Sequence, residues 1–180
     1  MATPSIQDYK SGQLKLLPDT VGVYALCDLD EVPIYVGQST DDICSRVRQH
    51  LISARSDVIA NRQIDVWEIA FVWAWELPKG GNINELEAHL YNQFHAVNPL
   101  VNGRKLNAVP MNVTPPTKIR VQVIPDDEIK LRLRPDRRFP RQIQHFNQLV
   151  DYIANTQDKP HLRKALEVYF RRLEKYYRAF

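Results

Sequence analysis

Two short apolar runs joined by an acidic turn constrain the fold of this chain more than any other feature. Residues 21–26 and 33–37 are rich in β-branched and aromatic side chains, and residues 28–31 between them form a turn-like run of Asp, Leu, Asp and Glu. The two runs predict a small β-hairpin. Each arm carries one tyrosine, Tyr24 on the first and Tyr35 on the second.

A helix is expected directly after this hairpin. Its candidate N-caps are Ser39, Thr40 and Asp41. The apolar residues that then recur at helical spacing are Ile43, Val47, Leu51 and Ala54. Arg46 and His50, four residues apart, stand together at one border of this apolar stripe. A helix docked on the hairpin would hold both side chains against its rim.

Two tyrosines, an arginine and a histidine in one place are compatible with phosphodiester chemistry. An arginine can hold a phosphate through two hydrogen bonds, and a phenol or imidazole can move the proton of an attacking water. A plainer interpretation also fits, in which Tyr24 and Tyr35 are ordinary strand aromatics and Arg46 and His50 border a solvated helix face. Residue types alone leave both interpretations open.

At these residues the sequence resembles the GIY-YIG nuclease superfamily. The two tripeptides of the family signature correspond to Gly22-Val23-Tyr24 and Tyr35-Val36-Gly37, each with Val in place of Ile. The arginine of the signature and the histidine four residues after it match Arg46 and His50. Several spaced elements agree in order, and the resemblance covers roughly residues 21–102.

The family pattern also expects a metal-binding glutamate on a later helix. Such a helix is predicted from Asn82 or Asn84 to about Val97. Glu87 borders its apolar stripe, whereas Glu85 points away from it. The resemblance therefore implies a Mg²⁺ or Mn²⁺ ion on Glu87, completed by phosphate oxygens and waters.

Three nearby residues remain rivals for this role: Glu85, His89 and His95. Pro99 ends the helix, and Asn102 follows in the place of the family's asparagine, where it would support the metal neighbourhood. The catalytic set that the resemblance implies is Tyr24, Tyr35, Arg46, His50, Glu87 and Asn102. In it the tyrosines and histidine relay the proton of the attacking water, and Arg46 neutralises the phosphate.

Composition bounds the class of protein. A chain of 180 residues with 44% hydrophobic content is ample for a folded core. The first twenty residues are interrupted by charges and Pro18, which predicts neither a secretory signal nor a membrane span. Cys27 and Cys44 form no Cys-x-x-Cys pair, so a disulfide scaffold or structural zinc is not expected. These observations favour a cytoplasmic protein.

Residues 66–77 are expected to form one long strand. The large residues at its odd positions are Trp67, Ile69, Phe71, Trp73 and Trp75, and the other face is apolar in its middle as well. A strand buried on both faces belongs in the centre of a sheet. The three tryptophans fit core packing better than base stacking.

The C-terminal part is more basic than the rest. Residues 1–100 hold 7 Lys and Arg against 13 Asp and Glu, whereas residues 101–180 hold 17 against 8. Alternation in residues 119–123 and 129–133 predicts a second hairpin with one apolar and one basic face. The basic residues of that face are Lys118, Arg120, Lys130, Arg132 and Arg134. A face of one sign favours contact with DNA phosphates.

Two helices are expected to close the chain. Ile143, Phe146, Leu149, Val150 and Ile153 set the inner face of the first, and Leu162, Leu166, Tyr169, Phe170, Leu173 and Tyr177 that of the second. The tyrosine-rich face fits either core packing or the interface of a homodimer. The predicted organisation is an α+β nuclease core over residues 1–104, a small mixed or antiparallel sheet flanked by helices, followed at 105–180 by a basic β-hairpin and a helical pair.

Taken with the resemblance, these features predict a metal-dependent DNA endonuclease. Two alternatives come from other classes of protein. One is a nucleic-acid-binding module that keeps the fold without the activity. The other is an interaction protein that docks an acidic partner or RNA through its basic C-terminal part.

Overall fold

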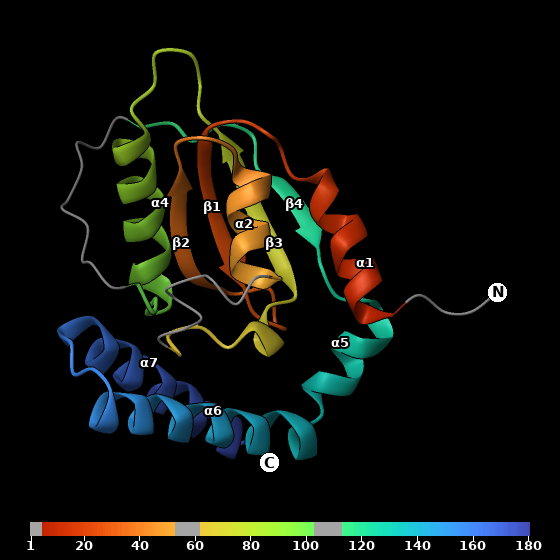
Figure 1. The fold of residues 1–180 in the computed structure, drawn as a ribbon, viewed down its shortest axis with the longest axis vertical. Coiled ribbons are helices and arrows are strands. Elements are labelled where there is room, and N and C mark those ends of the chain that lie inside the picture. Colours follow the sequence, from red (N-terminus) through yellow and green to blue (C-terminus); the bar gives the residue numbers. More distant parts are fainter. Residues whose placement is uncertain (1–4, 53–61, 103–112) are drawn as a thin grey trace.

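The computed structural model describes residues 5–52, 62–102 and 113–180 and has a four-stranded antiparallel sheet at its centre (Figure 1). The strands are β1 (Gly22–Cys27), β2 (Pro33–Ser39), β3 (Phe71–Glu76) and β4 (Ile119–Gln122), in the order β2-β1-β3-β4. The predicted hairpin is confirmed, with Tyr24 opposite Gly37. The predicted α+β class is confirmed as well.

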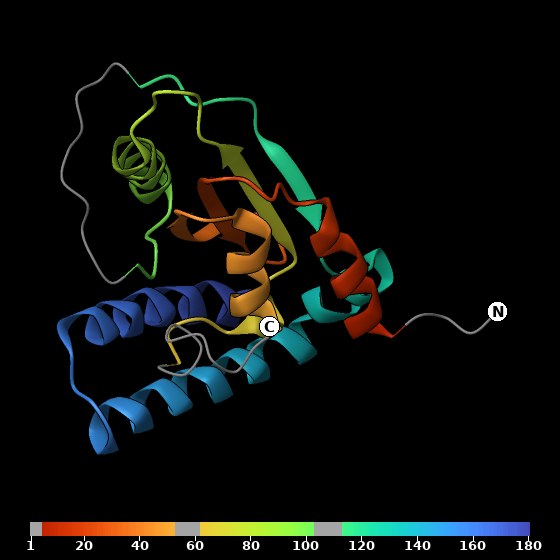
Figure 2. The same ribbon diagram turned by 45° about the horizontal axis from the view of Figure 1, so that its top comes forward.

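Helices surround this sheet. They are α1 (Ile6–Gln13), α2 (Ile43–Leu51), α4 (Ile83–Val97), α5 (Asp126–Leu133), α6 (Pro135–Asn155) and α7 (Pro160–Tyr177), with short 3-10 turns η1 (Leu14–Leu16) and η2 (Val66–Glu68). In Figure 1, α2 lies over one face of the sheet, α4 lies on the β2 side, and α1 lies on the β4 side. Figure 2 shows α6 and α7 as an antiparallel pair beyond one end of the strands, with α7 between α6 and α4.

Side-chain caps fix where the two site helices begin. Asp42, one residue after the predicted candidates, caps α2 by accepting a hydrogen bond from the Ser45 N–H at 2.5 Å. Asn82 caps α4 by accepting from the Asn84 N–H at 3.0 Å, which confirms the predicted start of that helix. Since α4 ends at Val97, its end was predicted too.

The prediction of one long strand over residues 66–77 is wrong. The Asp65 carboxylate accepts a hydrogen bond from the Trp67 N–H at 3.1 Å and so opens the turn η2, and the strand starts later, at Phe71. Trp67 consequently lies beneath the guanidinium group of Arg132 and does not belong to the strand. The strand that remains, β3, is interior to the sheet, as predicted for an apolar strand.

The predicted C-terminal hairpin is also wrong, because its second arm is the helix α5. The turn residues were in fact a helix start: Pro125 is the N-cap, and Asp126, Asp127 and Glu128 occupy the first turn, where the helix dipole favours negative charge. Glu128 then pairs with Arg132 one turn later, at 2.6 Å. Three alternating apolar residues were too few to establish a strand period.

The five basic residues predicted to share a hairpin face therefore do not share one. Arg120 donates to Glu31 twice, at 2.5 and 2.8 Å, and Lys118 lies 3.7 Å from the ring centroid of Trp73. Arg132 is buried, Arg134 pairs with Asp136, and Lys130 is an exposed residue of α5. These side chains mostly hold the edge strand β4 and the helix α5 in place.

A buried ionic network attaches the predicted helical pair, α6 and α7, to the core. From α6, Arg138 donates to Glu68 of η2 at 2.7 Å. From α7, Arg172 donates to Asp28 of the β1–β2 turn at 2.7 Å, and the hydroxyl of Tyr176 lies within hydrogen-bond distance of both guanidinium groups. Burial raises the pKa of Glu68 to about 7 against the opposing effect of the two arginines.

The inner faces of the two helices were only partly predicted. Leu149, Leu162 and Tyr169 are buried, but Phe170 and Tyr177 are 63% and 66% exposed. The predicted boundary at residue 104 falls before β4, which still pairs with β3 of the core sheet. Residues 105–117, which precede β4 and contain three prolines, lie largely outside the described residues. Among the helices that are described, none is both long and apolar enough to cross a membrane.

Candidate active site

Three rings meet where α2 lies over the β1–β2 hairpin. Tyr24 of β1 and Tyr35 of β2 have ring centroids 6.4 Å apart, and the imidazole of His50 from α2 lies 5.7 and 5.9 Å from them. The hydroxyl oxygen of Tyr24 is 2.7 Å from Nε2 of His50. Tyr24 and His50 are each 1% exposed, whereas Tyr35 is half-buried and nearer to solvent. The structure thus brings together three of the predicted site residues.

Gly37 is what allows Tyr24 to lie across the neighbouring strand. A Cβ at this position would sit 2.6 Å from the Tyr24 hydroxyl oxygen, 2.7 Å from its Cζ and 2.9 Å from Cε1 of Tyr35. Real Cβ atoms do not approach other atoms so closely. The glycine of the second tripeptide is therefore needed for space rather than for an unusual backbone angle.

Burial decides the protonation state of the phenols. It is the largest cause that raises the pKa of Tyr24, and the neighbouring Tyr35 raises it further. The pKa of Tyr35 is raised as well, first by burial and then by the negative charge of Glu87. A phenol with a raised pKa keeps its proton at neutral pH, so Tyr24 and Nε2 of His50 share their hydrogen bond with the phenol in its neutral form.

Arg46 stands at the border of this group, as the helical spacing predicted. Its Nη1 donates to Oε1 of Gln49 at 2.8 Å, which fixes the guanidinium group on the surface of α2. The same guanidinium group lies close enough to Tyr24 for its charge and a hydrogen bond to lower the pKa of that phenol. Arg46 is half-buried, which leaves part of its fork of donors open to an anion.

Asn102 holds the exposed edge of β2 at the site. Its Oδ1 accepts from the Val36 N–H at 3.0 Å, and its Nδ2 donates to the Val36 carbonyl oxygen at 2.6 Å. The side chain therefore pairs both backbone groups of the residue between Tyr35 and Gly37. Asn102 is buried, so its contribution is to position the strand that carries the tyrosine.

Glu87, from α4, is the carboxylate of the site. It is half-buried, and burial raises its pKa. Among the described residues, no Lys or Arg pairs with it, yet its charge acts on both Tyr24 and Tyr35. A desolvated carboxylate without a cation, next to two phenols, fits a hard divalent ion that takes its other ligands from phosphate and water. The described residues contain no cluster of three or more acidic, His or Cys ligands, so Glu87 would be the protein's anchor for such an ion.

The other candidates for the metal-binding role make different contacts or lie elsewhere on the helix. Glu85 is exposed and accepts from Nδ2 of the N-cap residue Asn82 at 3.1 Å. Nδ1 of His95 accepts from the Leu100 N–H at 3.0 Å, and its ring stacks on Tyr91. His89 is half-buried on α4, and no described contact joins it to the tyrosines.

Two supporting glutamines were missed at the level of sequence. Gln38 directly follows the second tripeptide and donates to Oδ1 of Asn84 at 3.1 Å, which ties β2 to the first turn of α4, one turn before Glu87. Its Oε1 is buried without a hydrogen-bond partner among the described residues. Gln49 orients Arg46 from three residues away. The only available signal was adjacency to the motif residues, since glutamine has no distinctive spacing.

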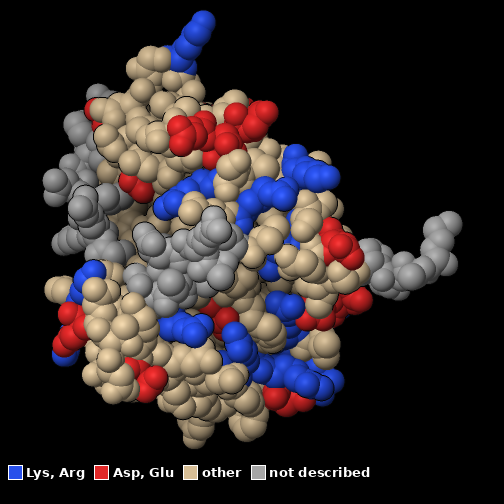
Figure 3. Space-filling model, in the orientation of Figure 1, with Lys and Arg blue, Asp and Glu red and all other residues tan. Residues whose placement is uncertain are grey.

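Basic side chains are prominent on the face of the molecule that α2 occupies. In Figure 3, which shows this face, Lys and Arg side chains lie across the middle of the molecule and around α5 and the start of α6, whereas acidic side chains lie at the upper edge and also along the right and lower edges. A concentration of positive charge on the face of the site would raise the local concentration of a polyanion.

Comparison with known proteins gives one match. Residues 20–100 match the family model of the GIY-YIG catalytic domain. This confirms the resemblance, and its span contains all of the candidate catalytic residues except Asn102, which lies two residues beyond it. Neither a curated protein nor a solved structure matches the chain at a significant level.

Proposed function

We propose that this chain, whose residues 20–100 belong to the GIY-YIG nuclease superfamily, is an endonuclease that hydrolyses phosphodiester bonds of DNA with the help of Mg²⁺ or Mn²⁺. Nuclease activity is what the family indicates, and the DNA substrate and the metal are our proposals. The observation that carries them is the closed set of Tyr24, His50 and Arg46 next to the carboxylate of Glu87, which has no cationic partner among the described residues.

The protein residues divide the proton transfer between them. Tyr35 is nearer to solvent and contacts Tyr24, whose hydroxyl is in turn hydrogen-bonded to Nε2 of His50. Because the raised pKa values keep both phenols protonated, neither acts as a standing phenolate base. A proton taken from the attacking water would therefore pass along the hydroxyls of Tyr35 and Tyr24 towards the imidazole of His50.

Two residues would meet the charge of the phosphate. Arg46 would donate two hydrogen bonds to its non-bridging oxygens and so stabilise the extra negative charge of the transition state. Glu87 would hold the divalent ion. When bound, such an ion polarises the phosphoryl group and stabilises the leaving oxygen. Asn102 acts at a distance by holding Val36, and with it the orientation of Tyr35.

The remaining expectations stay proposals. We propose a cytoplasmic setting, in which the buried Cys27 stays a reduced thiol. The exposed rings Phe170 and Tyr177 of α7 are the surface on which we would place a homodimer interface. We also propose that residues 105–180 grip the substrate, although β4 shows that they share the sheet of the core.

The second candidate function is a nucleic-acid-binding module without activity. Tyr24, Arg46, His50 and Glu87 are all present and in contact or close to one another, which favours the enzyme. An interaction protein that uses its basic C-terminal part is less favoured, because several of those basic residues are engaged in internal ion pairs.

The test is incubation of the purified chain with plasmid and branched DNA in Mg²⁺, Mn²⁺ or EDTA. We expect cleavage with either ion and none in EDTA. Arg46→Ala should slow single-turnover cleavage by on the order of a hundredfold, the scale of losing one preorganised donor to the transition state. Arg48→Ala, a half-buried arginine on the same helix, is the control and should cut like the parent. Binding without cleavage under every condition would favour the inactive module.

A further inference from the structure

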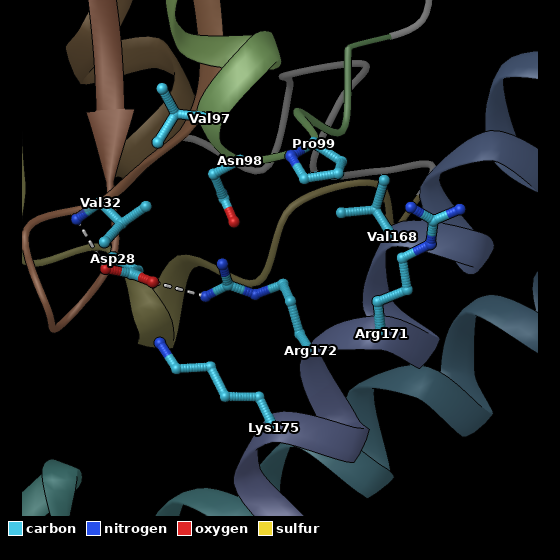
Figure 4. Close-up of a pocket in the computed structure, with 9 residues that line it drawn as sticks. All are labelled: Asp28, Val32, Val97, Asn98, Pro99, Val168, Arg171, Arg172 and Lys175. Carbon is cyan, nitrogen blue, oxygen red and sulfur yellow. Dashed lines mark hydrogen bonds and ion pairs between the residues drawn. The ribbon is translucent and has the colours of Figure 1, made fainter.

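A second concave site lies away from the tyrosines, where α7 meets the core. It is a pocket of about 290 Å³ between the β1–β2 turn, the end of α4 with the residues that follow, and α7 (Figure 4). The residues that line it are Asp28, Val32, Val97, Asn98, Pro99, Val168, Arg171, Arg172 and Lys175. None of them belongs to the candidate active site.

Three of these residues are cations from consecutive turns of α7, and they are not equivalent. Arg172 is committed to the fold, since Nη2 donates to Asp28 at 2.7 Å and to Tyr176 at 2.6 Å while the side chain is only 9% exposed. Arg171 and Lys175 are more than 60% exposed and lie on either side of it. The pocket therefore has a buried ion pair at its base and two exposed cations beside it.

The two outer cations have only weak partners. Arg171 pairs with Glu167 of its own helix at 2.5 Å, and Lys175 is 3.6 Å from Asp30, both at the surface. Exposed pairs of this kind contribute little to stability because water screens them. An incoming anion can replace either carboxylate at small cost, so Arg171 and Lys175 are available to a ligand.

The walls of the pocket are apolar, apart from one amide. Val32 and Val168 face each other across it, Val97 and Pro99 lie above, and the carboxamide oxygen of Asn98 points towards the Asp28–Arg172 pair (Figure 4). Nδ2 of Asn98 donates to the Pro33 carbonyl at 3.2 Å, which fixes its orientation. Val97 is 88% exposed, an unusual state for a valine that ends a helix over a pocket.

An apolar slot with a fixed amide and two exposed, weakly paired cations fits a phosphate group carried on a flat, partly apolar body. From this arrangement we infer that the pocket binds one unpaired nucleotide, with its base between the valines and its phosphate on Arg171 and Lys175. A volume of about 290 Å³ is at the lower end for ligand sites, which suits a single nucleotide. Paired bases cannot enter, so a duplex would reach only the cations.

The inference rests on the proposed function in one respect: it takes the nucleotide from a nucleic-acid strand near the nuclease site. A free mononucleotide offers the same chemistry. The pocket would then select substrates that contain a single-stranded segment, which the active-site residues alone do not specify.

The experiment measures binding of a fluorescein-labelled single-stranded oligonucleotide to the full chain in EDTA, by anisotropy. Arg171→Gln with Lys175→Gln should weaken binding by on the order of tenfold or more, as expected for lost charged hydrogen bonds. Arg178→Gln with Lys15→Gln removes the same charge from exposed positions outside the pocket and is the matched control, since Arg178 also forms an exposed pair with a glutamate of α7.

A second pair of variants tests the slot itself. Val97→Trp should fill the pocket and weaken binding to a similar degree, whereas Leu16→Trp, at a residue 64% exposed elsewhere, should not. Both positions are at the surface, so thermal melting should show folded protein. Deoxyadenosine 5′-monophosphate should displace the oligonucleotide from the parent. If Val97→Trp no longer binds the mononucleotide but still binds the oligonucleotide, the pocket binds a nucleotide as inferred, and that nucleotide is a free one.

Three results would overturn the inference. The first is an equal effect of the pocket pair and the control pair on single-strand binding. The second is full binding by Val97→Trp of both strand and mononucleotide. The third is that the pocket pair weakens binding of a duplex of the same sequence as much as it weakens binding of the single strand, while Val97→Trp has no effect on either. Plasmid cleavage in Mg²⁺ is measured separately. If the parent protein binds through the pocket but does not cut, only the proposed function is refuted. If the parent protein cuts while the pocket variants bind normally, only the pocket is refuted.

Discussion

Replacing Gly37 with alanine adds a single carbon atom and tests how closely Tyr24 packs on the second strand of the site. The new Cβ would lie 2.6 Å from the hydroxyl oxygen of Tyr24 and 2.7 Å from its Cζ. Carbon atoms in contact prefer about 3.5–4.0 Å, so the ring has to retreat by roughly 1 Å. Tyr24 is 1% exposed and held by His50, which leaves no free space for that movement.

The cost has two parts. Overpacking a core position by one methyl typically costs about 1–3 kcal/mol, and losing the Tyr24–His50 hydrogen bond costs about 0.5–1.5 kcal/mol. Together they predict a destabilisation of about 2–4 kcal/mol, which for a chain of this size lowers the melting temperature by roughly 5–15 °C. Because a catalytic group displaced by about 1 Å can lose a hundredfold in rate, cleavage should fall on that scale.

Thermal unfolding and single-turnover cleavage, measured on the same preparations, check both parts. Gly12→Ala is the control: nothing lies within 4 Å of its added Cβ, and alanine in helix α1 should stabilise by up to about 1 kcal/mol. Adding Tyr24→Phe to Gly37→Ala removes the nearest atom and should recover part of the stability but none of the activity. A Gly37→Ala protein that melts and cuts like the parent would refute the close packing of Tyr24 on Gly37.

Three further predictions concern the surroundings of the site. Asn102→Ala should lower the free energy of unfolding in urea by about 1–3 kcal/mol, because it leaves both backbone groups of Val36 unpaired. An unchanged urea midpoint would mean that water replaces the side chain without loss. Burial raises the pKa of Glu87, so protons compete with the metal for that carboxylate. The apparent Mn²⁺ affinity should therefore fall about tenfold for each pH unit below that pKa. An affinity that does not depend on pH would place the metal elsewhere. Arg138→Met should cost about 3–5 kcal/mol because the buried Glu68 loses its closest cation, against less than about 1 kcal/mol for Arg134→Met at an exposed pair. Equal melting temperatures of the two variants would refute the buried network.

The sequence predicted the elements whose signals are local. Val23 and Tyr24 of β1 have high strand preference. The acidic turn after the strand has its own side-chain hydrogen bonds, such as Asp28 Oδ1 accepting from Val32 N–H at 2.9 Å. Arg46 and His50 were placed correctly because helical spacing fixes their common side. Glu87 was distinguished from Glu85 by the same argument.

The errors came from patterns that two structures can share. Ile129, Leu131 and Leu133 alternate as in a strand, yet the acids after Pro125 stabilise a helix start, and in that helix Leu131 is 42% exposed. Trp67 shares the parity of Trp73 but is separated from it by a turn that a single Asp65 hydrogen bond opens. In both places one local polar group decided between two periods.

Contacts between residues far apart in the sequence could not be predicted from the sequence. Nothing local to Asn102 indicates that it pairs with Val36, 66 residues earlier, and nothing local to Arg138 indicates Glu68. The basic residues of the C-terminal part were interpreted as a surface for DNA. Several of them form ion pairs within the protein instead: Arg120, Arg132, Arg138 and Arg172. Composition gives a charge balance but not the partner of each charge.

The most direct test of the account is metal-dependent cleavage by Glu87→Ala and Glu85→Ala in parallel. The two glutamates are two residues apart on α4, but Glu87 is half-buried beside the tyrosines and Glu85 is exposed at the helix N-terminus. In a Mg²⁺ titration with plasmid DNA, Glu87→Ala should show no cleavage at any concentration while its DNA binding stays nearly unchanged. Glu85→Ala should cut like the parent. Cleavage by Glu87→Ala at the parental rate and with the parental Mg²⁺ dependence would contradict the assignment of the metal to that carboxylate.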